Sequence, residues 1–434
     1  MAATQNKSQA HTSVPSSKNI TRLELPNGIT VLVRSNPHSK SFTLRGYLAA
    51  GGLSVAEEKL GLADYAATAL MRGTATRDFQ GIYDSLESIG ASLGFSGGTH
   101  TTGFGGRALA EDLGHLLELL SDTLQNPSFP EEQIERLRAQ MLTGLAMRAQ
   151  DTRSMASLTF NELVYANHPY GRAEDGHPET ISAITRQDLL DFHASHFGPK
   201  GMVITIVGGI DPAQVTDQVQ KVLGGWKAPN QVNLPELPQW QPLPEGVHQR
   251  VEIPGKSQSD LVIGTAGPPR KADDYMAAAV GNSIFGRFGM MGRIGDVVRE
   301  KAGLAYYAYS ALGGGLGPSP WAVQAGVNPA NEEKASDLIF GEIKRFVNEL
   351  VDEDELADSQ SNIVGSMPLS LESNGGVAQA ILNIERYDLG MDFYLSYPDL
   401  VKAVTREEIR DAAAHYLQPD QLALAVAGPT REGK

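Results

Sequence analysis

Residues 61–74, GLADYAATALMRGT, carry two polar side chains at a spacing that could serve chemistry. Asp64 and Thr68 are four residues apart and therefore share one face of the helix that this stretch predicts. One carboxylate and one hydroxyl make a poor zinc site, because zinc sites use sets of His, Cys, Asp or Glu ligands. The same stretch has an apolar stripe at helical spacing, formed by Leu62, Ala66, Ala69 and Leu70. The residues alone therefore indicate a helix that packs in a core.

The composition excludes several other kinds of chemistry. The 434 residues include no cysteine, which rules out disulfides, thiolate zinc sites and cysteine nucleophiles. A net charge of -15 argues against nucleic acid or an anionic membrane as the partner, because phosphate binding needs clustered Lys and Arg. The same acidic character favours peptide ligands that are basic.

The chain has the composition of a soluble globular protein, with 41% hydrophobic and 20% charged residues. Residues 1–20 are polar and rich in serine, without the apolar segment of a secretory signal, and we expect a disordered lead-in there. No apolar run approaches the roughly 18 residues needed to cross a bilayer. These features predict a cytoplasmic protein with no membrane partner.

The elements that must position any site are repeated within the chain. Residues 181–210 align without gaps on residues 401–430, at a constant offset of 220. The identical pairs are Thr185/Thr405, Arg186/Arg406, Asp191/Asp411, Ala194/Ala414, Pro199/Pro419 and Gly208/Gly428. In each copy the threonine and an acid three residues later predict a capping box, followed by an amphipathic helix, a proline and a short apolar strand. A fixed offset that carries the same elements indicates duplication.

The repeat divides the chain into two halves of similar length. Residues 227–247 contain five prolines and predict a semi-rigid linker, because proline at this density prevents regular strand pairing. Both halves open with strands and continue into long helices, and Pro26, Asn27 and Gly28 predict a hairpin turn. We therefore expect an α+β fold with two homologous domains, residues 21–226 and 248–434. Each domain would be a mainly antiparallel β-sheet packed against a layer of helices.

Three segments of the first half resemble a known peptidase family. They read YLAAGGLSVAEEKLGLADYAATALMRGT, then a long stretch that begins LESIGASLGFSGG, and finally NHPYG. They are similar to the pitrilysin and mitochondrial-processing-peptidase family, the inverzincin metallopeptidases. The resemblance extends over nearly the whole chain after residue 20 and includes the duplication. It implies a peptidase-like domain in each half, of which the N-terminal one has a degenerate zinc motif.

The resemblance places the zinc motif of that family on residues 64–68, DYAAT. In active members this segment is H-x-x-E-H, in which two imidazoles bind zinc and the glutamate activates the metal-bound water. Here Asp64 and Thr68 stand at the ligand positions and Ala67 stands at the position of the base. The third ligand of the family falls near residues 143–145, which read Thr-Gly-Leu. The resemblance implies that this chain holds no metal or other cofactor and that zinc belongs to a partner subunit.

A segment of the second half, VVREKAGLAYYAYS, resembles the part of the family that contacts substrate beside the zinc. Arg299 and Tyr306 match its arginine and its tyrosine seven residues later. A guanidinium and a phenol can both donate hydrogen bonds to a peptide carbonyl and to the oxyanion that forms from it. By residue type and spacing alone, an exposed helix-end charge and an ordinary strand residue are the favoured explanation, because an arginine with a tyrosine seven residues later is common. The surrounding match favours the substrate role.

The glycine-rich stretch GRFGMMGR, residues 286–293, precedes this segment and fits neither a phosphate loop nor a dinucleotide site. Turn geometry is sufficient to explain its glycines. The resemblance adds a second interpretation, because non-catalytic members of the family use a glycine-rich loop near this place to handle substrate. On that interpretation Arg287 and Arg293 are substrate-binding residues.

These features together predict the zinc-free subunit of a heterodimeric zinc metallopeptidase. It would be inactive alone, and a homologous zinc-bearing subunit would complete a site that cleaves short or unfolded peptides. The alternative is a catalytically inert scaffold subunit of a larger complex, like the core-type members of the family. The presence of both Arg299 and Tyr306 favours the first reading, because a scaffold has no need of oxyanion donors.

Overall fold

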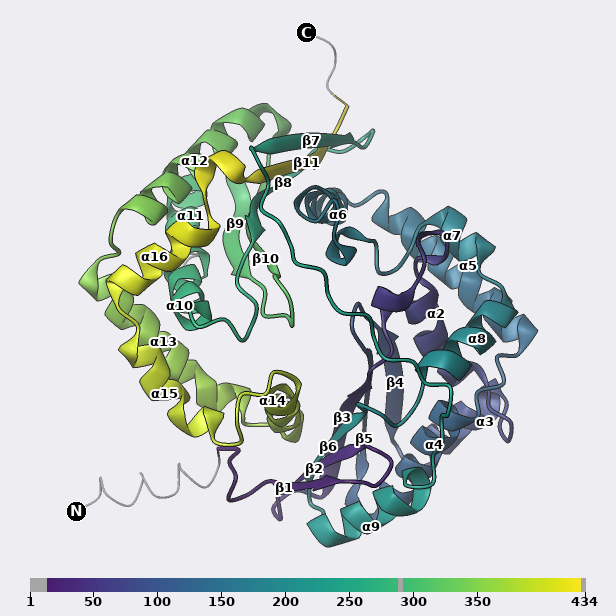
Figure 1. Ribbon diagram of the computed structural model, residues 1–434. Coiled ribbons are helices and arrows are strands. Elements are labelled where there is room, and N and C mark those ends of the chain that lie inside the picture. Colours follow the sequence, from purple (N-terminus) through teal and green to yellow (C-terminus); the bar gives the residue numbers. More distant parts are fainter. Residues whose placement is uncertain (1–13, 288–291, 431–434) are drawn as a thin grey trace, which may run out of the picture. The chain divides into compact units, whose positions relative to one another are not determined.

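The computed structural model describes residues 14–287 and 292–430, which form two compact units (Figure 1). The first unit comprises the residues up to 145 together with 173–236 and 368–395. The second comprises residues 146–172 and 237–367 and those from 396 onward. Each unit therefore contains a segment that comes from the other half of the sequence.

The first unit is built on a 6-stranded sheet with the order β1-β2-β6-β3-β5-β4. Neighbouring strands are antiparallel, except that β2 and β6 are parallel. The strands are β1 (Thr21–Glu24), β2 (Thr30–Ser35), β3 (Ser41–Leu48), β4 (Ser92–Gly97), β5 (Thr102–Leu109) and β6 (Val203–Gly208). The predicted hairpin turn joins β1 to β2, with Gly28 at a φ of 93° that favours glycine.

One face of this sheet packs on helices from the same half of the sequence. Alternate residues of β3, among them Phe42, Leu44 and Leu48, point to this face and are fully buried. The helices of this unit are α2 (Leu62–Ala69), α3 (Phe79–Glu87), α4 (Leu113–Gln125), α5 (Glu131–Arg148), α7 (Pro178–Ala183), α8 (Arg186–His196), α9 (Pro212–Leu223) and α14 (Asn374–Arg386). Of these only α14 comes from the second half, and it packs on the opposite face through Val377, Ile381 and Leu382.

The second unit repeats this plan with a 5-stranded sheet in the order β7-β11-β8-β10-β9. Its strands are β7 (Val247–Glu252), β8 (Ser259–Ala266), β9 (Ala305–Leu312), β10 (Pro320–Val327) and β11 (Ala423–Gly428). Only β7 and β11 are parallel neighbours among these described strands. The helices are α6 (Thr152–Val164), α10 (Tyr275–Gly286), α11 (Gly292–Gly295), α12 (Glu332–Asn348), α13 (Glu353–Ser370), α15 (Phe393–Ala403) and α16 (Arg406–Tyr416).

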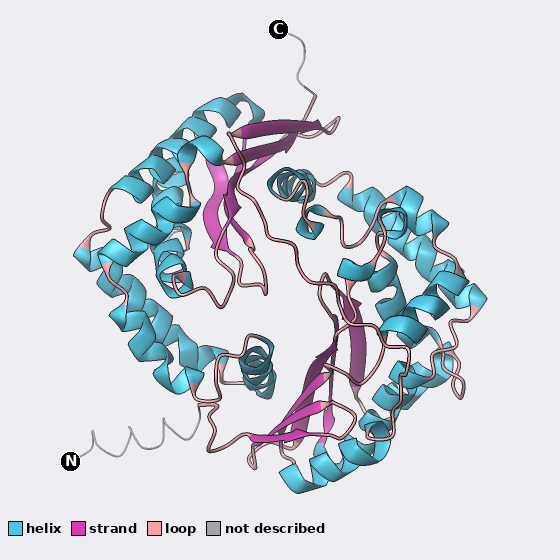
Figure 2. Cartoon of the chain, viewed as in Figure 1, coloured by secondary structure: helices cyan, strands magenta, loops and turns pink. Residues whose placement is uncertain are grey.

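The two units exchange one helix each. In the second unit α6, from the first half of the sequence, packs Ala156, Phe160 and Val164 on the face formed by Val262 and alternate alanines of β11. The other face of the same sheet packs on α10, α12 and α16. Figure 2 shows that helices lie on both faces of each sheet. The predicted α+β class with two homologous halves is confirmed.

The internal repeat is confirmed at the level of single residues. Helices α8 and α16 begin at Arg186 and Arg406, and strands β6 and β11 begin at Val203 and Ala423, each pair 220 residues apart. Both helices have the predicted capping box, with Thr185 and Asp188 in the first copy and Thr405 and Glu408 in the second.

We expected two segments to lack regular structure, the lead-in 1–20 and the linker 227–247, and the structure describes part of the first and all of the second. Of the lead-in 1–20, residues 1–13 lie outside the described residues, whereas Ile20 is buried and Ser17 bonds to Asp392. Residues 224–246 form neither helix nor strand, and they include nearly all of the predicted linker. This segment connects α9 of the first unit to β7, the first strand of the second unit.

Candidate functional site

The predicted positions of the family's zinc motif lie on α2, a helix that begins after Gly61 at a φ of 92°. The predicted apolar stripe is buried as expected. Asp64 and Thr68 are half-buried on one face, whereas Ala67 is fully buried and offers no polar atom. This helix is therefore a packed core element, and it contains the positions at which the resemblance predicts the family's metal ligands.

The carboxylate of Asp64 already has a structural partner. The backbone amide of Gly97, at the end of β4, donates a hydrogen bond of 3.1 Å to Oδ1 of Asp64. A Cβ atom at position 97 would lie 2.4 Å from the Cα atom of Asp64, so only glycine permits this approach. Burial raises the pKa of Asp64, and the nearby Asp175 and Glu174 act in the same direction against the hydrogen bond from Gly97.

The residues near the third ligand position do not complete a metal site. Thr143 and Gly144 are exposed on α5, and the Thr143 hydroxyl donates to the carbonyl of Ala139 at 2.8 Å. Leu145 is buried. Across residues 14–287 and 292–430 there is no group of three His, Asp or Glu side chains that could hold a metal ion. The donor set of this chain does not fit the zinc of the family.

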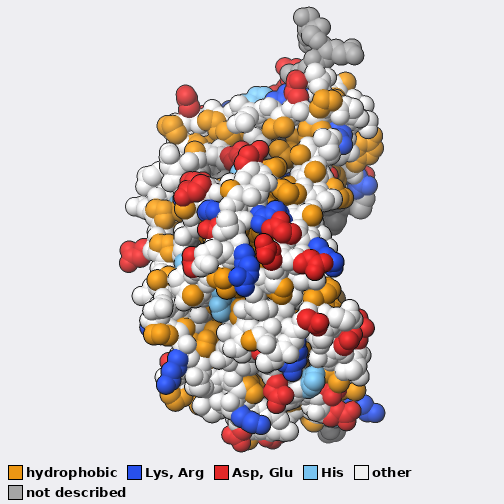
Figure 3. Space-filling model, turned by 90° about the vertical axis from the view of Figure 1, so that its right-hand side faces the viewer, with side chains coloured by type: hydrophobic (Ala, Val, Ile, Leu, Met, Phe, Trp, Pro, Cys, Tyr) orange, Lys and Arg blue, Asp and Glu red, His pale blue; other side chains and the backbone are white. Residues whose placement is uncertain are grey.

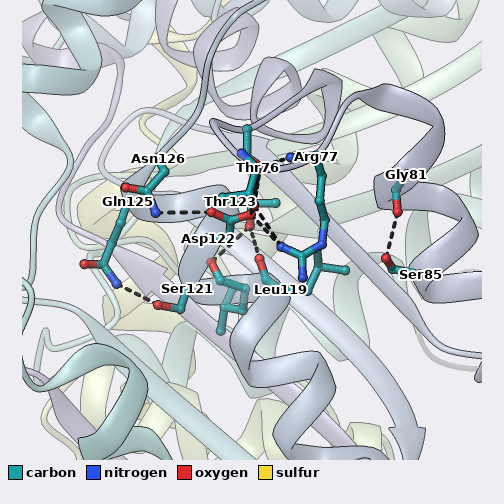
Figure 4. A network of polar contacts seen from close by, with 12 residues as sticks. Thr76, Arg77, Gly81, Ser85, Leu119, Ser121, Asp122, Thr123, Gln125 and Asn126 are labelled. Carbon is teal, nitrogen blue, oxygen red and sulfur yellow. Dashed lines mark hydrogen bonds and ion pairs between the residues drawn. The ribbon is translucent and has the colours of Figure 1, made fainter.

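The segment that follows α2 is fixed by a polar network that the sequence did not reveal. Gly73 has a φ of 151°, and after it the hydroxyl of Thr74 donates a hydrogen bond of 2.7 Å to Asp122 on α4. Asp122 also accepts hydrogen bonds from Thr76 and Arg77, both at 2.8 Å (Figure 4). The side chain of Asp122 is only 11% exposed. The MRGT sequence therefore ends α2 in a turn that is tied to a buried carboxylate.

The first unit also contains a sequence with the residue spacing of a nucleophilic-serine motif. Residues 94–98, GFSGG, fit the pattern G-x-S-x-G. However, Ser96 lies within β4, which continues through a short turn into β5. A nucleophile elbow needs a turn from a strand into a helix, so this serine is not in that arrangement.

Arg299 and Tyr306 lie on consecutive elements of the second unit. Arg299 belongs to a π-helical turn, η6 (Asp296–Lys301), which packs against β9. Its side chain is 36% exposed, and its Nε lies 3.8 Å from Oε1 of Glu300. Gly303, at a φ of 64°, then turns the chain into β9. Single π-helical turns are uncommon and occur frequently at functional sites.

Tyr306 is the extra residue of a β-bulge. In the pairing of β9 with β10, Gly326 faces Tyr307 and the next residue, Val327, faces Ala305, so Tyr306 is skipped. β9 is an edge strand, and a bulge there redirects a side chain away from the regular alternation. Tyr306 is 72% exposed, an unusual placement for a large aromatic side chain.

The neighbouring tyrosines of β9 have a different environment. Tyr307 donates a hydrogen bond to Asp260, a carboxylate that is 1% exposed and also accepts from Thr152 at 2.5 Å. The guanidinium of Arg153 lies 4.7 Å from the ring centroid of Tyr307. Burial and the hydrogen bond to Asp260 raise the pKa of Tyr307. This network is structural, and the sequence did not indicate it because its members lie on three separate elements.

The two arginines predicted at the glycine-rich stretch differ in their surroundings. Residues 288–291 of that stretch lie outside the described residues. Arg287 is exposed at the end of α10. Arg293 is 12% exposed and pairs with Glu355, with Nε 2.9 Å from Oε1. The hydrogen bond to Glu355 raises the pKa of Arg293. These contacts are those of a buried ion pair, and a substrate role for either arginine stays a prediction.

The surface shows no segregation of charge on the face drawn in Figure 3. Lys and Arg side chains alternate there with Asp and Glu, and hydrophobic side chains lie between them. The net charge of -15 is therefore not gathered into one patch on this face. Within the described residues, no helix is both long enough and apolar enough to span a bilayer.

Comparisons with protein families match both halves of the chain. The profile described as Insulinase (Peptidase family M16) matches residues 30–173. The profile described as Peptidase M16 inactive domain matches residues 183–363. An uncharacterized zinc protease of Streptomyces coelicolor is 25% identical over 422 residues, which cover 95% of this chain and 90% of that protein. A probable mitochondrial-processing peptidase subunit beta of Arabidopsis thaliana is 27% identical over 198 residues, 46% of this chain and 37% of that protein.

Solved structures agree with these matches. A structure described as a peptidase M16 inactive domain from Pseudomonas fluorescens is 26% identical and has a TM-score of 0.88, covering 96% of this chain and 99% of that chain. A chain of complex III2 from Candida albicans shares the fold with a TM-score of 0.78 at 16% identity, over 94% of this chain and 95% of that chain. The predicted family is confirmed. The chain belongs to peptidase family M16.

Proposed function

We propose that this chain is the zinc-free subunit of a heterodimeric M16 peptidase, in which a homologous subunit carries the zinc motif. The observation that supports the proposal most strongly is the placement of Tyr306, 72% exposed at a bulge of an edge strand. Arg299 lies on the π-helical turn that packs against the same strand. A packed structural role would bury the aromatic ring, whereas a role toward a second molecule requires it to be accessible.

The chemistry of this pair suits peptide hydrolysis. The guanidinium of Arg299 and the phenol of Tyr306 are both hydrogen-bond donors. In the proposed reaction they donate to the carbonyl oxygen of the scissile peptide, and these bonds strengthen as water attacks and the oxygen gains negative charge. Activation of that water belongs to the partner subunit, because this chain has neither the ligands nor the base. Short or unfolded peptides are the proposed substrates.

The test compares the chain alone with the chain co-purified with a zinc-bearing M16 subunit from the same source. Zinc content and cleavage of an unstructured peptide are measured for both. We expect no zinc and no cleavage for the chain alone, and cleavage by the pair. Tyr306→Phe and Arg299→Gln should each lower kcat/KM of the pair by roughly 10²–10³-fold, the effect of removing one oxyanion donor. Stoichiometric zinc in the isolated chain would overturn the proposal.

Two control variants make this result specific. Lys301→Gln removes a positive charge from the same π-helical turn; the side chain of Lys301 is 72% exposed, and its ammonium pairs with Asp296 at 2.6 Å. Tyr83→Phe removes a hydroxyl from an exposed tyrosine of α3. Both should leave kcat/KM within about threefold, since surface substitutions usually have small effects. An active pair that is indifferent to changes at Arg299 and Tyr306 would instead favour the scaffold role.

A further inference from the structure

A cavity of about 420 Å³ lies within the first unit, and neither Asp64 nor Asp122 lines it. Its floor is formed by β3, β4 and β5, and its wall by one face of α14. The residues of the wall are Gln379, Leu382 and Arg386. The volume falls within the range of small-ligand pockets, roughly 300–1,000 Å³. All of these elements belong to one compact unit, so the cavity is a property of that unit alone.

Few side chains rise from the floor of the cavity, because several of its residues are glycines. The register of the sheet places Arg45, Gly105 and Gly94 in one row across β3, β5 and β4. The next row on the same face contains Tyr47, Gly103 and Ser96. An extended ligand can therefore approach the backbone of β5 and β4 beside the side chains of β3.

The packing of the protein does not account for these glycines. A Cβ atom on Gly94 would meet no described atom within 4 Å, and one on Gly105 would meet only the Leu44 carbonyl at 3.7 Å. Gly46, on the opposite face, differs, because a Cβ atom there would lie 2.2 Å from the Phe104 ring. Glycine within a strand is unfavourable and often marks a place where another backbone comes close.

The cavity is cationic although the chain is strongly acidic. Arg45 and Arg386 both line it, and none of the described lining residues carries a carboxylate. Glu385, next to Arg386 in the chain, is fully engaged by Arg22, through bonds of 2.7 and 3.1 Å to its two oxygens. Nε of Arg386 is buried and has no hydrogen-bond partner within the described part of the chain. A buried donor without an acceptor is unfavourable, and a bound anion would satisfy it.

The other lining groups complement an organic anion rather than a bare inorganic ion. The guanidinium of Arg386 lies 5.7 Å from the ring centroid of Tyr47, and Leu382 adds an apolar surface beside it. Burial raises the pKa of Tyr47 to about 12, so its phenol stays protonated and can donate a hydrogen bond. The cavity thus combines two cations, a phenol, an apolar patch and an open backbone floor.

We propose that this cavity binds a carboxylate-bearing residue of a peptide, with the carboxylate between Arg45 and Arg386 and the peptide backbone over Gly94 and Gly105. The carboxylate is either the C-terminal group of the peptide or an Asp or Glu side chain. This inference rests on the proposed function in one respect, because peptides are taken as the ligand class. It reverses the expectation from net charge that basic peptides are preferred.

The test is direct binding of peptides to the chain without any partner subunit, measured by calorimetry. Three acetylated unstructured peptides of the same length are compared: one with a free C-terminal carboxylate, the same peptide amidated, and an amidated form in which one internal residue is replaced by Glu. We expect either charged form to bind roughly 10- to 100-fold more tightly than the neutral amide, the effect of a charge-assisted hydrogen-bond pair. The charged form that binds identifies the source of the carboxylate. Equal affinity for all three would overturn the proposal.

Three variants locate the binding. Arg45→Gln and Arg386→Gln should each weaken the charged peptide by roughly tenfold and leave the amide unchanged. The matched control is Arg107→Gln, which removes an exposed cation from β5 outside the cavity lining and should have little effect. Gly94→Val should block the floor without loss of stability, because a Cβ atom there meets nothing in the described protein. An equal loss of affinity in the Arg107 variant would mean a general charge effect and would refute the cavity.

The two proposals fail in different ways. If peptide carboxylates do not bind the chain alone but a co-purified pair cleaves peptides through Arg299 and Tyr306, only the cavity proposal is wrong. If carboxylates bind through Arg45 and Arg386 but no zinc-bearing partner yields an active pair, only the proposed function is wrong. Arg45 is exposed, so its substitution should leave the fold intact. The test therefore stays valid even where a change at Arg386 perturbs folding.

Discussion

The amide of Gly97 donates a hydrogen bond of 3.1 Å to the carboxylate of Asp64, which joins the end of β4 to α2. The resemblance predicts the family's first zinc ligand at this position, whereas in this chain the oxygen of Asp64 holds two elements of the first unit together. Asp64 therefore serves this chain as a structural acceptor. This relationship gives a prediction about stability that does not involve metal.

Asp64→Asn should keep the acceptor for Gly97 and remove a half-buried charge, so we expect a free energy of unfolding at pH 7 no lower than that of the native chain. Asp64→Ala leaves the amide without its acceptor and should cost about 1 kcal/mol. Urea unfolding followed by circular dichroism measures both. A loss in the Asn variant as large as that in the Ala variant would show that the charge, not the acceptor, matters.

The pH dependence of the Asp64 variants follows from the direction of the pKa shift. Burial raises the pKa of Asp64 in the folded chain above the unfolded value of about 3.9. Between the two values the folded state binds more protons than the unfolded state, so this group's contribution to stability falls as pH rises through that window. The native chain should therefore lose stability relative to Asp64→Asn as pH rises from about 4, and the difference should be constant at higher pH.

The contribution of Asp122 to stability should have the opposite pH dependence. Burial alone would raise its pKa, but hydrogen bonds from Thr74, Thr76, Asn126 and Arg77 outweigh burial and hold the pKa below its usual range. Its stabilisation is present above the unfolded pKa of about 3.9 and is lost as pH falls through the folded pKa. Asp122→Ala should cost about 3 kcal/mol at pH 7, because several buried donors lose their acceptor, and progressively less as pH falls below about 3.9.

The control for Asp122 is Asp84→Ala, which removes an exposed acid of α3 that bonds only to Gln80 at 2.6 Å among the described residues. It should change the free energy of unfolding by less than about 0.5 kcal/mol at every pH. Urea unfolding of both variants at several pH values between 3 and 7 provides the comparison. A loss at Asp122 that does not depend on pH would mean that packing rather than charge holds the turn after α2.

The features that the sequence predicted correctly depend on neighbours in the chain. The capping boxes of α8 and α16 involve residues three positions apart, and the hairpin at Gly28 needs only a local turn with positive φ. The repeat was visible because both copies keep these local signals at the same offset. Local hydrogen bonds and periodicity are encoded within a few residues, so a single sequence is sufficient to identify them.

The features that the sequence did not predict depend on distant partners. The bond between Thr74 and Asp122 joins residues 48 apart, and that between Thr152 and Asp260 joins residues 108 apart. The exposure of Tyr306 is set by a bulge in its pairing with β10, which no local pattern reveals. The exchange of α6 and α14 brings Arg386 to the sheet of the first half, so the cavity beside Arg45 was also beyond prediction.

Substitutions at Arg293 distinguish a residue that contacts substrate from one that belongs to a buried ion pair. Its guanidinium pairs with Glu355 and lies 3.9 Å from Glu342, whose side chain is 3% exposed. Arg293→Ala leaves the carboxylate of Glu355 without this cation, whereas Glu342 keeps Arg345 at 2.9 Å, and it should cost about 3 kcal/mol in the free energy of unfolding. Arg287→Ala, at an exposed position, should change it by less than about 0.5 kcal/mol.

Measurements of peptide cleavage, together with stability, separate a structural role of Arg293 from a role in substrate binding. A structural Arg293 predicts that Arg293→Lys recovers part of the stability, because it restores the charge but not the planar fork that bonds both oxygens of Glu355. In a co-purified pair, any loss of peptide cleavage should then follow the loss of folded protein. If Arg293→Ala unfolds at the native urea concentration and yet raises KM for peptides, Arg293 contacts substrate and its pairing with Glu355 contributes little to stability.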